Sequence, residues 1–102
     1  MQETPVLVVI ELVSVEDAAG LRSYIERAAA LIGPLGGVMV GRGGVPVEGE
    51  PGFGPLVLQR WPSEAAFRAW LASEAYQPLQ EIRRASATMR VAVVPISGGL
   101  GA

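Results

Sequence analysis

VLVVIELV, residues 6–13, is a run of apolar and mostly β-branched residues that only Glu11 interrupts. β-branched residues favour strands, and successive side chains of a strand point to opposite faces of a sheet. Here both sets of alternating positions are apolar, with Val8 and Ile10 on one side and Leu7 and Val9 on the other. This pattern is typical of a central strand that is buried on both faces.

Outward from this strand, apolar spacing and turn residues predict the remaining elements. Three further segments have the character of strands, at residues 36–44, 55–61 and 89–96. Ser14 is expected to cap a helix that runs to about Ile32. Ser63 and Ser73 are expected to cap two later helices. The stretch 43–55 is rich in Gly and Pro, so we interpret it as a loop.

The order strand, helix, strand occurs twice along the chain. Two such units interleave into one sheet, which predicts an α+β fold of the ferredoxin-like type, βαββαβ. Its four-stranded antiparallel sheet would carry helices on one face only. Residues 1–96 would form this single domain, and the Gly-rich residues 97–102 would form a flexible C-terminal tail.

Helices on one face leave the other face of such a sheet open. The first strand and residues 91–94 are apolar on both sides, so an uncovered face would expose a large apolar patch. Burying apolar surface stabilises a protein by roughly 25 cal/mol per Å². A second copy on a two-fold axis is the simplest cover and predicts a homodimer through the open sheet face. The alternative cover is the loop at 43–55 folding back, although it has few apolar side chains.

The composition excludes several kinds of chemistry. The chain of 102 residues has no Cys and no His, and all 8 of its basic residues are Arg. Thiol nucleophiles, Schiff-base lysines and imidazole bases are therefore absent, and we expect no metal and no cofactor. A net charge of −2 argues against nucleic-acid binding, which needs a positive field. No segment is long enough to span a membrane or arranged as a signal peptide, so we expect a cytoplasmic protein without membrane contact.

Several short motifs follow one another in a distinctive order. They are Gly36-Gly37, Arg42-Gly43-Gly44, Val47-Glu48-Gly49, Trp61-Pro62-Ser63, Ser73-Glu74-Ala75-Tyr76-Gln77 and Arg83, preceded by Tyr24 in the first helix. The ordered set resembles the bacterial domain-of-unknown-function family thirteen-thirty, within the dimeric α+β barrel superfamily. The resemblance covers nearly the whole chain and implies a homodimeric barrel. The superfamily includes cofactor-free monooxygenases, muconolactone isomerases and haem-binding enzymes, and the family itself has no agreed activity.

The chain departs from the family pattern at two motifs. Trp61 stands where the family usually has Phe. Glu74 stands where it has Pro, and Ala75 where it tends to have an acid. These changes alter the start of the last helix, but they leave Ser73 and Tyr76 in place.

Arg42 and Glu48 are the first candidate ligand-binding residues. Arg42 lies at the end of a strand among glycines, where its guanidinium would hold a carboxylate or another anion. Glu48 is the best candidate for a base in a chain without histidine, because an apolar pocket would raise the pKa of its carboxyl. The alternative for both is an ion pair with each other across the loop.

Four further residues complete the candidate set. Tyr24 and Tyr76, the 2 tyrosines of the chain, would either point a hydroxyl into a pocket or simply pack in the core. Trp61 ends a strand beside the loop, so it is expected to face a ligand. The resemblance favours Arg83 over its neighbour Arg84 as the inward-facing arginine. No one of these residues is singled out as catalytic.

Two functions are compatible with these residues. The dimer would enclose a pocket between sheet and helices that binds a small organic molecule, with cofactor-free isomerisation or oxidation as the reactions in view. The alternative is a non-enzymatic structural or regulatory dimer whose interior is filled by its own side chains. A Mg²⁺ or Ca²⁺ enzyme is a distant third possibility, because no acidic cluster has the spacing of a metal site.

Overall fold

The computed structural model describes residues 4–96 of the chain, so the tail expected at 97–102 lies outside the described residues. In order, the elements are β1 (Val6–Val15), α1 (Ala18–Ile32), the 3₁₀ helix η1 (Gly33–Leu35), β2 (Val38–Gly43), β3 (Leu56–Trp61), α2 (Glu64–Ala72), α3 (Gln77–Ser86) and β4 (Ala87–Pro95). None of these helices has the length and apolarity that crossing a membrane requires.

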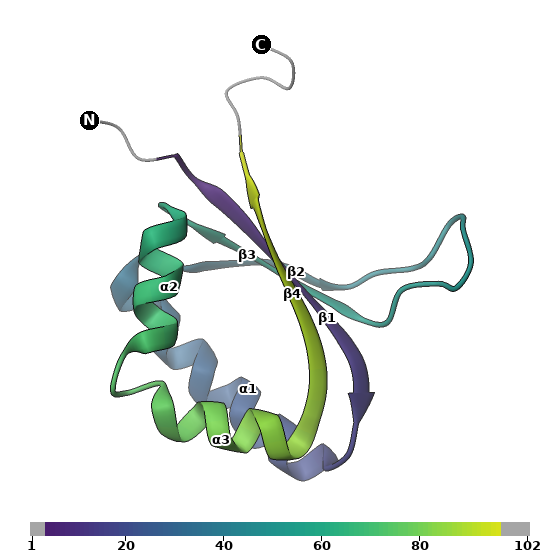
Figure 1. Cartoon of the computed structure of the whole chain (residues 1–102), viewed down its shortest axis with the longest axis horizontal. Coiled ribbons are helices and arrows are strands. Elements are labelled where there is room, and N and C mark those ends of the chain that lie inside the picture. Colours follow the sequence, from purple (N-terminus) through teal and green to yellow (C-terminus); the bar gives the residue numbers. More distant parts are fainter. Residues whose placement is uncertain (1–3, 97–102) are drawn as a thin grey trace.

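The four strands form one antiparallel sheet in the order β2-β3-β1-β4. The helices all lie on one side of this sheet, and its other side is uncovered (Figure 1). This is the ferredoxin-like α+β fold that the sequence predicts, and that prediction is confirmed. β1 lies between β3 and β4, as expected for the strand that is apolar on both sides.

The strand register assigns each side chain of β1 to a face. Val8 pairs with Gln59 of β3, and both are buried beneath the helices. Val9 pairs with Leu58 of β3 and with Ala92 of β4 on the opposite side. We call that opposite side, which no helix of the described chain covers, the open face.

The core lies between the sheet and the helices. Its largest fully buried side chains are Trp61, Tyr76 and Leu79. The ring of Trp61 packs 5.5 Å from Phe67 and 5.7 Å from Trp70, measured between ring centroids. Such aromatic pairs add to the energy of burial, so this end of the domain is rigidly packed.

Two of the three predicted helix caps are wrong. β1 continues through Ser14, which pairs with Thr88, so α1 begins later and Asp17 caps it by accepting a hydrogen bond from the Gly20 amide at 3.0 Å. Ser73 lies at the end of α2, where its hydroxyl donates to the Trp70 carbonyl at 2.7 Å. The cap predicted at Ser63 is confirmed, because its hydroxyl accepts from the Ala66 amide at 3.0 Å.

We therefore expect the two serines to differ on substitution. Ser63→Ala should lower the free energy of unfolding by about 1 kcal/mol, because it leaves an amide at the start of α2 without its acceptor. Ser73→Ala is the matched control and should cost less, because the Trp70 carbonyl still accepts from the Ser73 backbone amide at 3.1 Å. Urea denaturation of both variants measures the difference, and an equal loss would contradict the assignment of the caps.

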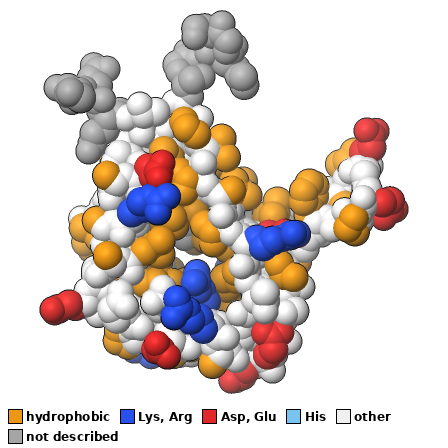
Figure 2. Space-filling view, in the orientation of Figure 1, with side chains coloured by type: hydrophobic (Ala, Val, Ile, Leu, Met, Phe, Trp, Pro, Cys, Tyr) orange, Lys and Arg blue, Asp and Glu red, His pale blue; other side chains and the backbone are white. Residues whose placement is uncertain are grey.

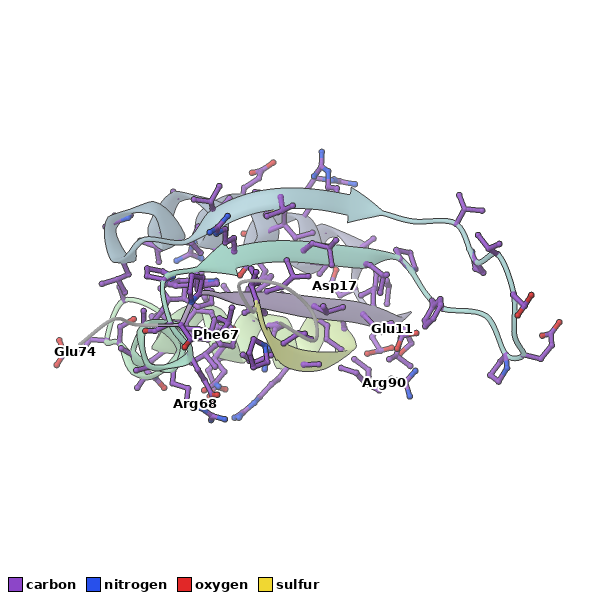
Figure 3. The ribbon with its side chains drawn as sticks, turned by 90° about the horizontal axis from the view of Figure 1, so that it is seen from above. Glu11, Asp17, Phe67, Arg68, Glu74 and Arg90 are labelled. Atoms are coloured by element: carbon purple, nitrogen blue, oxygen red, sulfur yellow. The ribbon has the colours of Figure 1, made fainter. Side chains whose placement is uncertain are left out.

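The loop between β2 and β3, residues 44–55, extends far beyond the ends of these two strands (Figure 3). Its base is fixed where the Leu12 amide donates to the Pro55 carbonyl at 2.8 Å and the Gly54 amide donates to the Glu11 carboxylate at 2.9 Å. Towards its tip, Val45 is 84% and Val47 is 94% exposed. The tip of the loop thus leads away from the sheet, whereas Phe53 near its base lines a hollow on the open face together with Val9 and Ala92.

Candidate functional site

A cavity of about 110 Å³ lies between α1 and the sheet. A second hollow of about 200 Å³ adjoins it on the side of α2 and α3. Four residues line both, namely Ile10, Tyr24, Gln59 and Arg83. Figure 2 shows a hollow between the sheet and the helices, with hydrophobic side chains around it and basic side chains at its rim. We call the shared residues the waist of the cavity.

A pair of tyrosines stands beside the waist. Tyr24 projects from the buried side of α1, and Tyr76 precedes α3 and is fully buried. Their hydroxyl oxygens are 3.0 Å apart, which is a hydrogen bond in which either group is able to donate. The Tyr76 ring also packs on Trp70 with 4.2 Å between centroids. Residues 52 positions apart are thereby joined in one polar group inside an apolar interior.

Burial raises the pKa of Tyr24 far above its ordinary value, and the hydrogen bond to Tyr76 raises it further. The nearby positive charge of Arg83 acts in the opposite direction, but its effect is smaller. Tyr24 is therefore a neutral phenol at physiological pH. It is able to donate a hydrogen bond at the cavity, and it does not supply a negative charge there.

Two arginines bring positive charge to the cavity. Arg83 lies on α3, seven residues after Tyr76 and so on the same side of the helix, and it is half-buried whereas Arg84 is exposed. Arg42 lies on β2 opposite Val57, on the side of the sheet that faces the helices, and it is exposed at the rim of the cavity. No Asp or Glu of the described residues lines either hollow. The two guanidinium charges are thus not neutralised by a carboxylate in the wall.

Comparison with known proteins gives this arrangement its context. The model of a protein family described as a domain of unknown function, DUF1330, matches residues 5–96. The chain belongs to the DUF1330 family. The family suggested by the ordered sequence motifs is therefore confirmed. No curated protein matches the chain significantly.

Solved structures share the fold of this DUF1330 chain at low sequence identity. A protein of unknown function from Rhodopseudomonas palustris is 17% identical with a TM-score of 0.80, over 96% of this chain and 86% of that one. SnoaB, a cofactor-independent oxygenase from Streptomyces nogalater, is 22% identical with a TM-score of 0.68, over 95% and 97%. A putative antibiotic biosynthesis monooxygenase from Bacillus cereus is 15% identical with a TM-score of 0.52, over 94% and 96%. At these identities the likeness establishes the fold alone.

The structure brings together four of the six sequence candidates, namely Tyr24, Arg42, Tyr76 and Arg83. Glu48 lies in the projecting loop, where it lines a shallow depression made by that loop. The ion pair expected between Arg42 and Glu48 does not form; the ion pairs of the described residues are Arg68–Glu64 and Arg90–Glu11. The loop leads outward, which separates Glu48 from the cavity.

Trp61 is placed differently from what its position in the sequence indicates. The loop enters β3 at Leu56, so Trp61 stands at the far end of that strand and is 0% exposed among core aromatics. Sequence reasoning also missed Gln59, which is 7% exposed and lines the waist. The sequence does contain a sign of it, because Gln59 is the single uncharged polar residue within the strand LVLQRW. It is two positions from Trp61 and therefore lies on the same face of the strand.

No group of three or more acidic, His or Cys side chains among residues 4–96 is arranged to hold a metal ion. The hydrogen-bond donors at the cavity are two guanidiniums, the bonded pair of tyrosine hydroxyls, which keeps one O–H free, and the amides of Gln59 and Gln80. Donors of this kind bind oxygen atoms that carry negative charge. Chemically, the site is therefore equipped to hold an oxyanion beside an apolar wall.

The raised pKa of Tyr24 makes a prediction about alkaline stability. In the unfolded chain its phenol ionises near pH 10, whereas the folded chain retains the proton to a higher pH. The folded state then binds more protons, so the stability that is complete below pH 10 should decline as the pH rises above it. Tyr24→Phe should flatten this decline, at a neutral-pH cost of about 1–2 kcal/mol from the unpaired Tyr76 hydroxyl. Urea denaturation at pH 7 to 11 measures both effects, and an equally steep decline in the variant would contradict the prediction.

Proposed function

We propose that this chain binds a small, largely apolar organic anion in the cavity between its sheet and its helices. The observation that supports this most directly is the presence of Arg42 and Arg83 in an apolar wall that contains no carboxylate. Arg83 is half-buried, and partly desolvating a charge without a partner is costly, so a bound carboxylate or enolate supplies that partner. Arg42 is exposed and adds positive charge at the outer rim of the cavity. Arginine suits this role because its planar fork of donors matches two oxygens at once.

The size of the cavity limits the ligand. A cavity of about 150 Å³ in a protein core is known to accept benzene. The inner cavity, at about 110 Å³, is close to that size, and the adjoining hollow of about 200 Å³ adds room on the far side of the waist. The ligand class is therefore a compact acid with one or two rings or a short branched chain. Its apolar part would contact side chains such as Leu12, Ile10 and Met89.

The polar groups define what reaction would be possible there. Guanidiniums and a neutral phenol stabilise negative charge as it develops on an oxygen, which is the requirement for forming an enolate. The described lining offers no carboxylate base, so the site favours a substrate that is acidic enough to ionise on binding. Cofactor-free isomerisation and oxygenation both pass through such an anion. A cofactor-independent oxygenase has the same fold, so the fold is compatible with this reaction class.

The alternative of a non-enzymatic dimer without an open pocket has less support. It requires the interior to be filled by the chain's own side chains, whereas two adjoining hollows remain between sheet and helices. We retain the homodimer itself as part of the proposal. The open face carries Val9, Leu58 and Val94, and Val94 is 46% exposed. A second copy packed on this face would bury them, and a cytoplasmic location is part of the same proposal.

Titration with benzoate, and with benzyl alcohol as its uncharged counterpart, tests the proposed function. Benzoate should raise the melting temperature in a concentration-dependent way and shift the NMR signals of residues around the waist. Benzyl alcohol should do so at least about tenfold more weakly, because it lacks the charge that pairs with the arginines. Equal effects of the two compounds, or no effect of either, would contradict an anion site.

A further inference from the structure

Gln59 occupies an unusual position for an amide side chain. It is buried on the helix-facing side of β3 and lies at the waist, where it lines both hollows. A glutamine amide has one oxygen that accepts and one nitrogen that donates two hydrogens. Which of the two faces the cavity decides whether the ligand must accept or donate a hydrogen bond at that point.

The neighbouring Trp61 settles this orientation. Its indole nitrogen donates to the Gln59 side-chain oxygen at 3.0 Å. An indole N–H is only a donor, so the nitrogen of the amide cannot take the place of the oxygen there. The Gln59 oxygen is thereby turned towards Trp61, and its NH₂ group is turned away from Trp61. Among the hydrogen bonds of residues 4–96, this NH₂ group donates none.

The Trp61 ring is itself held in place, so the orientation of the amide is fixed before any ligand arrives. Phe67 and Trp70 pack against it, and it is fully buried. On its other side lies Gly37, where a Cβ would approach the Trp61 ring to 2.7 Å. No side chain fits between this backbone and the indole, and the ring has no room to swing away from Gln59.

We propose that Trp61 is a positioning residue that, through Gln59, makes the cavity select ligands with a hydrogen-bond acceptor at the waist. The inference rests on the proposed function and deepens it, because it concerns an uncharged contact separate from the two arginines. A carbonyl or carboxylate oxygen receives the free Gln59 N–H groups. A ligand with a methylene at the same point leaves a buried donor without a partner and is rejected.

Two uncharged probes of the same shape isolate this contact from the charge of the arginines. Acetophenone carries a carbonyl oxygen where α-methylstyrene carries a CH₂ group. We expect the wild type to bind acetophenone about tenfold more tightly, as measured by NMR titration. Gln59→Leu should bring the two affinities together. Trp61→Phe should reduce the preference to about threefold or less, because the amide is then free to turn its oxygen towards the ligand.

Trp70→Phe is the matched control for Trp61→Phe. The Trp70 indole N–H is buried without a hydrogen-bond partner in the described structure, so its removal takes no bond from Gln59. Both affinities would shift together in this variant, and the preference for acetophenone should stay about tenfold. A second readout needs no ligand: the Gln59 side-chain NH₂ signals in ¹⁵N–¹H spectra should move in Trp61→Phe and stay in Trp70→Phe.

The possible failures are distinguishable. If neither probe nor benzoate binds the wild type, the proposed function falls and ligand selection falls with it. If benzoate binds but neither uncharged probe does, the proposed function stands and the inference is overturned. If both probes bind equally well, the cavity binds ligands but the inference is overturned. A full preference in Trp61→Phe, or the same loss in Trp70→Phe, would also overturn it, since Trp61 would then not be what holds the amide. Gln59 signals that do not move in Trp61→Phe would also overturn the inference. If Trp61→Phe does not fold, the comparison of the two probes in Gln59→Leu still tests the contact between Gln59 and the ligand.

Discussion

Val9→Asp should raise the dissociation constant of the proposed homodimer by at least about a hundredfold. Val9 is at the centre of the open face, between Leu58 and Ala92 on the adjacent strands. Packing a second copy there would bury the new carboxylate beside Glu11, which already engages Arg90 in an ion pair, and this costs about 3–5 kcal/mol. Each 1.4 kcal/mol is a factor of ten in affinity. Sedimentation equilibrium over a range of protein concentrations measures the change.

The control for this variant is Leu35→Asp. Leu35 is 43% exposed in η1, on the helix side of the molecule and outside both hollows. An added charge there should leave the dimer intact. Circular dichroism checks that Val9→Asp still folds, since its side chain is partly exposed in the single chain. Dimers of wild-type affinity in Val9→Asp would show that self-association does not use the open face.

Arg83→Leu is expected to have the largest effect on the affinity for an anion. Arg83 lines both hollows, so its guanidinium is within reach of a ligand on either side of the waist. Hydrogen bonds to charged groups are worth about 1.5–3 kcal/mol, so benzoate binding should weaken by about 10- to 150-fold. Leucine keeps the apolar part of the side chain, and acetophenone binding should change by less than about threefold. Isothermal titration calorimetry or NMR titration measures both constants.

Arg84→Leu provides the matched control. It removes the same charge one residue further along α3, but this side chain is exposed and lines neither hollow. Benzoate affinity in this variant should stay within about twofold of the wild type, because exposed charges at this distance are screened by salt. An equal loss in the two variants would mean that benzoate responds to the overall charge of the chain and not to a site at the waist.

Much of the fold could be predicted from local patterns. The two-sided apolar character of residues 6–13 identified the central strand, because a strand side chain has only two possible directions. The positions of helices and strands followed from spacing and from Gly and Pro. Helix starts were less certain, since Ser14 and Ser73 have the chemistry of a cap but are used elsewhere. Pairing of Ser14 with Thr88 in the sheet competes with capping, and only the assembled strands decide that competition.

The site was partly predictable for the same reason. The tyrosines were found because polar groups among apolar ones are conspicuous in a sequence, whereas Arg83 was preferred over Arg84 only through the family resemblance. Glu48 was expected near Arg42 because six residues separate them, yet a projecting loop carries it away. Gln59 was not singled out, because nothing local indicates that the end of β3 is fully enclosed.

The sequence by itself determined which of its strands would be central, that this strand would be apolar on both faces, and which side-chain chemistry was absent. These are properties of side-chain type and alternation, and they hold wherever the strands are placed. Only the tertiary structure decided that Tyr24 and Tyr76 share a hydrogen bond and that Trp61 fixes the Gln59 amide beside Arg83. The physical reason is that such contacts join different elements. Their distances depend on how the helices pack on the sheet, and the sequence of one segment alone does not specify that packing.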